Sequence, residues 1–250
     1  MIPDRRRALA VLNVFIALAL ASPREAAATW SIVAVDPETR QVGSAGASCT
    51  PFVAGIVAVA PGKGVIVAQA MSNAEARLHG VGMLAKGASP AQVIAAVANK
   101  EFDSDWQEQQ YGVAALGFED ASAAFTGAGT YDVKGDLQGY GVSVQGNILT
   151  NKEVIERALA AFLAPPAKPA TSRSLAERLL SALEAGAEAG GDKRCGKQTA
   201  MSSYVVVAKP DDDPVHPSTL VIVREDEGGA NPVRVLRERY ERARQKRQGH

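Results

Sequence analysis

One residue of this chain could become a nucleophile that carries its own base. Thr29 follows three alanines, Ala26–Ala28, at the end of an N-terminal segment. If the chain is cut after Ala28, its new first residue bears both a hydroxyl and a free α-amine. An α-amine has an unperturbed pKa of about 7.7–8.0, so it can take the hydroxyl proton near neutral pH. The sequence therefore indicates a threonine that proteolytic processing would activate.

The segment before Thr29 has the order of parts that is typical of a secretory signal. Arg5–Arg7 precede an apolar run over residues 8–21, and a polar break separates this run from the alanines. The run is shorter than the ~20 residues of a transmembrane helix, although an uncleaved membrane anchor is the alternative. Small residues also permit cleavage after Ala21, which would leave Ser22 first. The signal rule alone does not choose between Ser22 and Thr29.

A threonine nucleophile also needs hydrogen-bond donors for the oxyanion that forms during the reaction. Gly146 and Asn147 follow a predicted strand, and they offer an open backbone amide and a side-chain amide. These groups are the donors of an oxyanion hole. A turn that leads into the next helix would explain the same two residues without any chemistry.

Charged groups that act on the amine could come from the glycine-rich stretch 190–199. Asp192 could pair with the amine or with a nearby cation. Lys193 and Arg194 could lower the pKa of the amine by charge repulsion, or they could bind an anionic substrate. A helix C-cap followed by a solvated charged loop is the alternative explanation.

Two polar residues at strand ends could orient Thr29. Ser48 ends the predicted strand 41–48, and it would lie beside Thr29 if this strand forms a hairpin with the preceding one. Gln69 lies in an otherwise apolar run, and a buried polar side chain needs hydrogen-bond partners. Gln69 is therefore either a structural or a catalytic residue.

The elements that must position these residues follow from apolar periodicity and turn signals. Clusters of strands separated by helices favour an α+β layered domain over a strictly alternating α/β one. The sequence predicts strands over 30–36, 41–48, 54–60, 64–70, 112–118, 121–126, 139–145, 205–208 and 220–223. It predicts helices over 74–86, 90–99, 152–163, 174–189 and 233–248.

Length and charge narrow the classes of function. Removal of residues 1–28 would take away four basic and two acidic side chains, and it would leave 222 residues with a net charge of −2. This length fits one domain over 29–231, followed by a basic C-terminal helix over 232–250. The small net charge argues against general nucleic-acid binding, and no further segment is apolar enough to span a membrane. The basic helix is either a solvated face or a contact with an anionic surface.

The cysteines and histidines are too few and too scattered for a metal site. The chain has two cysteines and three histidines, and its glycine-containing turns match no nucleotide-binding fingerprint. We therefore expect neither a metal nor a cofactor. Cys49 and Cys195 could form a disulfide after export into an oxidising compartment, or they could stay two separate buried thiols.

Five segments of the chain, taken together and in order, form a specific pattern: 29–37, 67–70, 124–127, 144–149 and 190–194. This pattern resembles the bacterial domain-of-unknown-function family 1028. That family is placed in the N-terminal nucleophile hydrolase superfamily, whose members cleave amide bonds. The resemblance implies a four-layer αββα sandwich of two antiparallel sheets, with Thr29 as the first mature residue. Members of the family are often cytosolic and begin Met-Thr, whereas this chain begins with a predicted export signal. The resemblance spans residues 29–223.

The residues and the resemblance together predict a periplasmic or secreted amidohydrolase that acts on a small amide or peptide. Thr29 would be its nucleophile. One alternative is a binding module that keeps the fold without turnover, and another is an interaction protein that works through the basic helix. The substrate follows from neither line of reasoning, and a homo-oligomer is left open.

Overall fold

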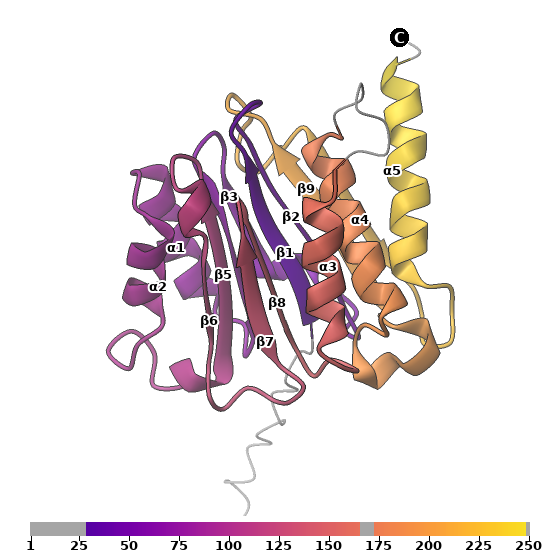
Figure 1. The fold of residues 1–250 in the computed structure, drawn as a ribbon, viewed down its shortest axis with the longest axis horizontal. Helices are drawn as coiled ribbons and strands as arrows, with labels where there is room; N and C mark the ends of the chain where they lie inside the picture. The colour runs from indigo at the N-terminus through magenta and orange to yellow at the C-terminus, as the bar shows by residue number, and fades with distance from the viewer. Residues whose placement is uncertain (1–28, 166–172, 249–250) are drawn as a thin grey trace, which may run out of the picture.

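A computed structural model describes residues 29–165 and 173–248 of the chain (Figure 1). The predicted signal peptide, residues 1–28, lies outside this described part, and so do both of its cleavage sites. Residues 249–250 of the predicted terminal helix also lie outside it.

Two antiparallel sheets form the centre of the molecule. The six-stranded sheet has the order β10 (Thr219–Arg224), β9 (Ser202–Ala208), β2 (Gln41–Ser48), β1 (Thr29–Asp36), β8 (Val142–Asn147) and β7 (Gly135–Gly139). The four-stranded sheet has the order β3 (Val57–Ala60), β4 (Gly64–Ala70), β5 (Gln109–Ala115) and β6 (Ala123–Thr126).

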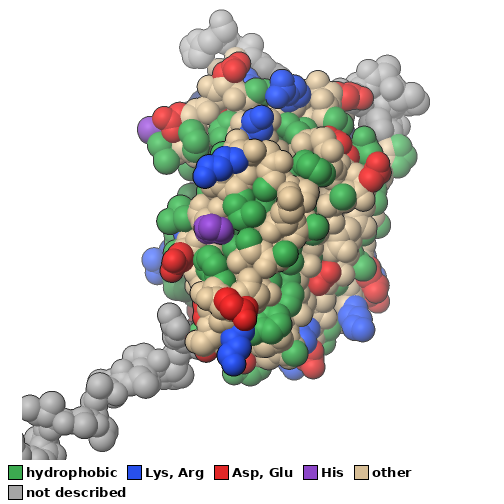
Figure 2. Space-filling view, turned by 90° about the vertical axis from the view of Figure 1, so that its left-hand side faces the viewer, with side chains coloured by type: hydrophobic (Ala, Val, Ile, Leu, Met, Phe, Trp, Pro, Cys, Tyr) green, Lys and Arg blue, Asp and Glu red, His purple; other side chains and the backbone are tan. Residues whose placement is uncertain are grey.

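Helices cover the outer face of each sheet (Figure 1). The four-stranded sheet carries α1 (Ala74–Ala85) and α2 (Pro90–Val97). The six-stranded sheet carries α3 (Glu153–Leu163), α4 (Leu175–Glu188) and α5 (Pro232–Gln248). The predicted fold class, an α+β sandwich with the four layers αββα, is confirmed. Figure 2 shows the face made by α1 and α2, where charged side chains of both signs are scattered among apolar ones.

Strand β1 shows how the alternation of side chains builds two separate cores. Trp30, Ile32 and Ala34 are fully buried and pack with α3 and α4 in the largest apolar cluster. Val33 and Val35 point to the other side of the strand, into the space between the sheets. Because successive strand residues face opposite sides, Thr29 shares the side of Val33. The side chain of Thr29 therefore faces the inter-sheet space.

The helix boundaries follow capping signals in the sequence. Helix α4 begins after Ser174, whose hydroxyl accepts the backbone N–H of Glu177, while the Glu177 carboxylate accepts the N–H of Ser174. Beyond the end of α4, Gly191 has a φ of +56° and donates its N–H to the carbonyl of Gly186 at 3.1 Å. This is the glycine C-cap that the sequence predicts.

Four predicted strands differ from the observed ones by three residues at an end, and one of them, predicted over 205–208, is β9, which begins at Ser202. The strand predicted from residue 54 begins at Val57, because Ala54–Ile56 form a short 3-10 helix, η1. The strand predicted over 112–118 is β5, which begins earlier, at Gln109, and whose first two residues are the buried glutamines Gln109 and Gln110. The strand predicted over 139–145 is β8, and it runs as far as Asn147. Buried polar residues explain the last two differences, since they do not register as part of an apolar pattern.

The basic helix α5 uses several arginines within the fold. Arg237 forms a two-point ion pair with Glu184 of α4, at 2.8 and 2.6 Å. Arg239 and Arg247 donate to backbone carbonyls of β10 and of the residue before it, at 3.4 and 2.8 Å. Strand β10 is an edge of the larger sheet, where unpaired carbonyls would otherwise be open to another strand. Arg239 and Arg247 therefore bond carbonyls along this edge of the sheet.

Within residues 29–165 and 173–248, no helix combines the length and the apolar character that crossing a membrane requires.

Candidate functional site

Thr29 starts β1 near the middle of the six-stranded sheet, between two strands that both end beside it. It lies opposite Ser48 of β2 and opposite Asn147 of β8. Ser48 in turn lies opposite Ser202 of β9. Directly opposed residues on antiparallel strands share one face. Asn147, Thr29, Ser48 and Ser202 therefore form one polar row that borders the inter-sheet space, and each of them is at most 1% exposed.

The predicted hairpin of β1 and β2 is what brings Ser48 to Thr29. The hydroxyl of Ser48 accepts a hydrogen bond from the hydroxyl of Thr50 at 3.0 Å. Ser202 donates to the carbonyl of Thr50 at 2.6 Å. The segment that leaves β2 is thus tied to two members of the polar row. In the full chain the nitrogen of Thr29 is an amide bonded to Ala28, so it can act as a base only after cleavage.

Gln69, at the end of β4, reaches across the inter-sheet space to Thr29. Its Nε2 donates to the Thr29 carbonyl at 3.3 Å, and its Oε1 accepts from the Ser31 hydroxyl at 2.6 Å. The Ser31 hydroxyl also accepts from Gln145 Nε2 at 2.7 Å. The partners that a buried glutamine needs are therefore present, and they include the backbone of Thr29.

A second glutamine, Gln110 of β5, holds the other side of the site. Its Oε1 accepts from Gln69 Nε2 at 2.7 Å and from Asn147 Nδ2 at 3.1 Å. We call Ser31, Gln69, Gln110, Gln145 and Asn147 the inter-sheet network. Gln110 is not among the predicted site residues, because it falls in a stretch whose sequence looks like a polar loop. Two glutamines directly before an apolar strand were the available signal.

The residues of the predicted oxyanion hole lie within β8 and not in a turn. Asn147 belongs to the polar row, whereas Gly146 lies opposite Trp30 and so one position out of the row. A Cβ on Gly146 would meet the side chain of Leu149 at 2.8 Å, so its Cα faces the helix layer. The structure thus brings Asn147 to Thr29, and close packing accounts for the glycine beside it.

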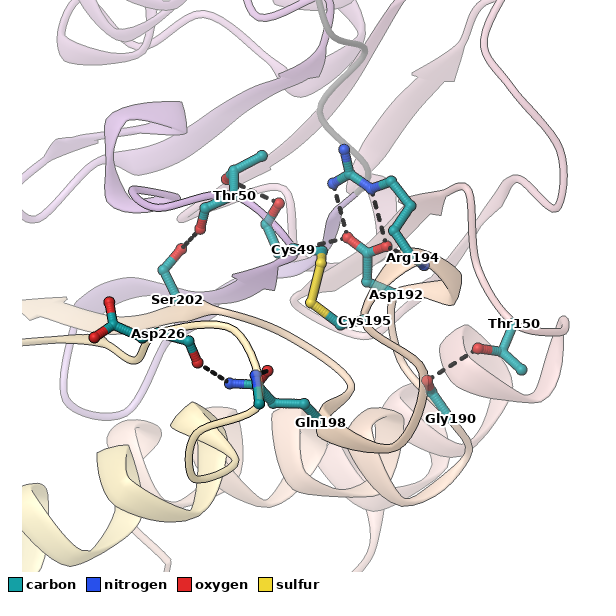
Figure 3. The surroundings of a disulfide bond; sticks show 12 residues. Cys49, Thr50, Thr150, Gly190, Asp192, Arg194, Cys195, Gln198, Ser202 and Asp226 are labelled. Atoms are coloured by element: carbon teal, nitrogen blue, oxygen red, sulfur yellow. Dashed lines mark hydrogen bonds and ion pairs between the residues drawn. A yellow bond between two sulfur atoms is a disulfide. The ribbon is translucent and has the colours of Figure 1, made fainter.

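Asp192 is fully buried, and its carboxylate has several partners (Figure 3). Its Oδ2 accepts from the backbone N–H of Cys49 at 2.7 Å and from Arg194 Nη2 at 3.0 Å. Its Oδ1 accepts from the backbone N–H and from Nε of Arg194, at 3.0 and 3.2 Å. Of the two partners that the sequence offered Asp192, the cation is in contact with it, and the amine would form only after cleavage before Thr29. The backbone N–H of Lys193 donates to Ile148, and Lys193 itself is exposed.

A disulfide joins Cys49 to Cys195, with 5.6 Å between their Cα atoms (Figure 3). Cys49 directly follows Ser48 of the polar row, and Cys195 lies in the 3-10 helix η4 (Lys193–Gln198). The predicted pairing is confirmed. The bridge and the Asp192 carboxylate together fasten η4 to the end of β2, next to the polar row.

Strained backbone gathers at the same end of the sandwich. Ala70 directly follows Gln69, and Ile148 directly follows Asn147, with φ angles of +65° and +50°. Thr199, whose carbonyl accepts from the Asp192 N–H at 3.0 Å, has a φ of +66°. A positive φ is unfavourable for any residue with a Cβ, and most of all for β-branched ones. Such residues concentrate at functional sites.

The family that these residues belong to follows from a comparison with family models. One model, described as a family of unknown function, DUF1028, matches residues 29–236. The chain belongs to this DUF1028 family. It is also similar to the crystal structure of another DUF1028 protein, from Silicibacter pomeroyi, with 27% identity, 86% of each chain covered and a TM-score of 0.71. No curated protein matches the chain.

The DUF1028 match begins at Thr29, which belongs to the polar row. Beside that row lies a cleft of about 450 Å³, a size that suits a small ligand. Cys49 and Arg194 line the cleft, but Thr29 does not. The described residues bring together no three metal-binding side chains that could hold an ion.

Proposed function

We propose that this protein is an exported amidohydrolase of the N-terminal nucleophile type, with Thr29 as its nucleophile. The observation that carries the proposal is the position of Thr29 in the polar row, where Ser48 and Asn147 flank it on the side of the sheet that faces the inter-sheet space. The start of the family match at Thr29 supports it. The four-layer sandwich also fits that superfamily.

Cleavage after Ala28 would turn an inert peptide nitrogen into the catalytic base. The new amine accepts the proton of the Thr29 hydroxyl, directly or through a water, while Oγ1 attacks the carbonyl carbon of the substrate amide. The protonated amine then gives its proton to the departing nitrogen, and the C–N bond breaks. An ester between Oγ1 and the acyl group is left. Water, deprotonated by the same amine, hydrolyses this ester and restores the hydroxyl.

Asn147 is the proposed donor to the oxyanion. Its Nδ2 has two N–H groups, and one of them is used by Gln110. The second would donate to the substrate oxygen as negative charge develops on it. Gly146, one residue before Asn147 at the end of β8, would be a backbone donor only to a substrate oxygen that reaches the end of this strand.

The remaining predicted residues would support this chemistry from the sides. Gln69 holds the carbonyl of Thr29, and Ser48 borders its side chain. Asp192 fixes Arg194, whose positive charge, with that of Lys193, would lower the pKa of the amine or attract an anionic substrate.

Export is part of the proposal, because it supplies both events that the site needs. A signal peptidase would expose Thr29, and an oxidising compartment would form the bond between Cys49 and Cys195. Both point to the periplasm or the extracellular space.

The test starts from the exported protein, whose intact mass and N-terminal sequence establish where it begins. Protein that begins at Thr29 is then treated with a β-lactone, which acylates catalytic threonines. We expect one adduct on Thr29, its absence in Thr29→Ala, and its retention in Ser203→Ala, the matched control, whose buried hydroxyl bonds the carbonyl of Pro232 away from the polar row. A mature chain that starts at Ser22, or a lactone adduct only at other residues, would contradict the proposal.

One observation favours a second candidate, a binding module without turnover. The cleft beside the disulfide does not include Thr29, so a ligand could bind there without meeting the nucleophile. In that case a ligand found by screening would bind Thr29→Ala as tightly as the unaltered protein. Substitution of Lys197, which lines the cleft, would weaken it.

A further inference from the structure

Gln110 bonds two residues beside Thr29, Gln69 and Asn147. The proposed reaction gives Gln110 no role of its own. The geometry points to Gln110 as a positioning residue, which sets the side-chain amides of Asn147 and Gln69 on the two sides of Thr29. Its effect on catalysis rests on the proposed function of Thr29. Its hydrogen bonds do not, so the two can be tested separately.

The orientation of the Gln110 amide is determined by its partners. Nε2 donates to the Thr126 hydroxyl at 2.8 Å and to the carbonyls of Gly135 and Gly146 at 3.1 and 3.0 Å. Two carbonyls can only accept, so the nitrogen must face them, and Oε1 must face the opposite way. Gln110 is fully buried, so no solvent competes for these positions.

The single atom Oε1 of Gln110 then serves both neighbours of Thr29. It accepts from Asn147 Nδ2 at 3.1 Å, which fixes the plane of the Asn147 amide. It also accepts from Gln69 Nε2, the same nitrogen that donates to the Thr29 carbonyl. The same oxygen atom therefore positions the proposed oxyanion donor, Asn147, directly and the backbone of Thr29 through Gln69.

This arrangement matters because an oxyanion donor must point in the right direction before the charge develops. An Asn147 amide without a partner on one N–H could rotate about its last torsion angle, which is broad. Its second N–H would then lose its direction relative to Thr29. A misplacement of about 1 Å can slow a reaction by about 100-fold, so Gln110 can control the rate without touching the substrate.

Variants of two neighbouring glutamines separate positioning from stability. Gln109 is as deeply buried as Gln110 and also hydrogen-bonded, but it bonds Asp103 and Tyr111 on the opposite face of β5. In mature protein, Gln110→Met and Gln109→Met should both lower the free energy of unfolding. Only Gln110→Met should slow β-lactone acylation of Thr29, by between about tenfold and 100-fold. Equal slowing in both variants would overturn the inference.

Gln110→Glu provides a conservative rescue, and it also serves if the methionine variant does not fold. The carboxylate keeps an acceptor for Asn147 and Gln69, but it loses the donor to the two carbonyls and buries a charge. We expect Gln110→Glu to be the less stable of the two variants and yet the faster in acylation. Acylation rates that simply follow stability would overturn the inference.

A double variant shows whether Gln110 acts through Asn147. If it does, Gln110→Met should slow acylation less once Asn147→Ala is present, because only the effect through Gln69 is then left. Slowing that multiplies in full would contradict the inference.

One readout does not depend on activity. In ¹⁵N spectra of the unaltered protein, the side-chain amide protons of Asn147 should exchange slowly with solvent, and in Gln110→Met they should lose this protection. An unchanged Asn147 signal would overturn the inference, whether or not Thr29 reacts. A lactone that leaves Thr29 unlabelled in unaltered mature protein would sink the proposed function alone.

Discussion

The two faces of β1 bury residues of opposite character. Towards the helices, Trp30, Ile32 and Ala34 are all apolar and fully buried. Towards the other sheet, the strand begins with Thr29 and Ser31 and becomes apolar only further along, at Val33 and beyond. Valine side chains pack well in the inter-sheet space, so packing alone does not explain the polar side chains of Thr29 and Ser31.

The polar half of that space, which holds the inter-sheet network, has hydrogen-bond partners for its buried side chains. Among the described residues, the buried side-chain atoms without a hydrogen-bond partner are Trp30 Nε1, Ser122 Oγ, Asn151 Oδ1 and Arg244 Nε. None of them belongs to the inter-sheet network, whereas Trp30 lies on the apolar face of β1. A buried amide is tolerated only when its partners are in place. Packing accounts for the apolar residues of this space, and the polar residues are those that the proposed role of Thr29 would require.

The largest expected effect is on the apolar face. Trp30→Ala should lower the free energy of unfolding by about 3–5 kcal/mol, because it removes a large, fully buried side chain. The indole packs against Gly186 of α4, where an added Cβ would lie 2.6 Å from Nε1. Urea denaturation of the mature protein measures the change. A loss below about 1 kcal/mol would show that this face is not the main source of stability.

The disulfide should have the next largest effect, and it acts at the polar end. Cys49 and Cys195 are 146 residues apart. Replacing both by serine should cost about 2–5 kcal/mol, since the unfolded chain gains freedom. Denaturation with and without a reductant measures the effect. The reductant should destabilise the unaltered protein and leave the double variant unchanged, and equal sensitivity in both would contradict this assignment.

Much of the fold could be predicted because most strands carry one apolar face. Strand β1 and helix α4 were visible as local apolar patterns. Strand β7 was not predicted, because Gly135–Gly139 contains a single large apolar residue, Leu137, and looks like part of a turn. It forms an edge of the sheet. A strand with one neighbour and partly buried side chains does not need a continuous apolar face.

The site was predictable only in part, for a related reason. Thr29 and Ser48 could be paired because a short hairpin links their strands. The bonds of Gln110 to Gln69 and Asn147 join residues 41 and 37 positions apart, on strands of both sheets. No local pattern encodes such contacts. Residues that touch only through the tertiary fold therefore need the structure to be found.

The inter-sheet network offers a smaller and more specific effect. Gln145→Leu removes one donor to the Ser31 carbonyl and hydroxyl, and Ser31→Ala removes a donor to Gln69. Each single change should cost about 1–3 kcal/mol. The double variant should cost less than their sum, because it removes both ends of one hydrogen bond. Urea denaturation of all three variants measures this, and full additivity would show that the two side chains act independently.

The smallest effect near neutral pH should come from the apolar half, where the Tyr204 hydroxyl bonds Ser44 at 2.7 Å. Burial raises the pKa of Tyr204 above its ordinary value near ~10. Below pH ~10 the phenol is neutral in both states, and its contribution to stability is complete. Above that pH the unfolded phenol ionises first, so the free energy of unfolding should fall by up to about 1.4 kcal/mol per pH unit.

Tyr204→Phe should therefore cost about 1 kcal/mol at pH 7, from the lost bond to Ser44. It should also flatten the decline of stability above pH ~10. Tyr111, whose pKa burial also raises, lies beneath α1 and α2 and provides the matched comparison. Denaturation of both phenylalanine variants between pH 7 and pH ~11 measures the two slopes. If Tyr204→Phe leaves the alkaline slope unchanged, the apolar half of the inter-sheet space is more open to water than its burial indicates, and its contrast with the polar half weakens.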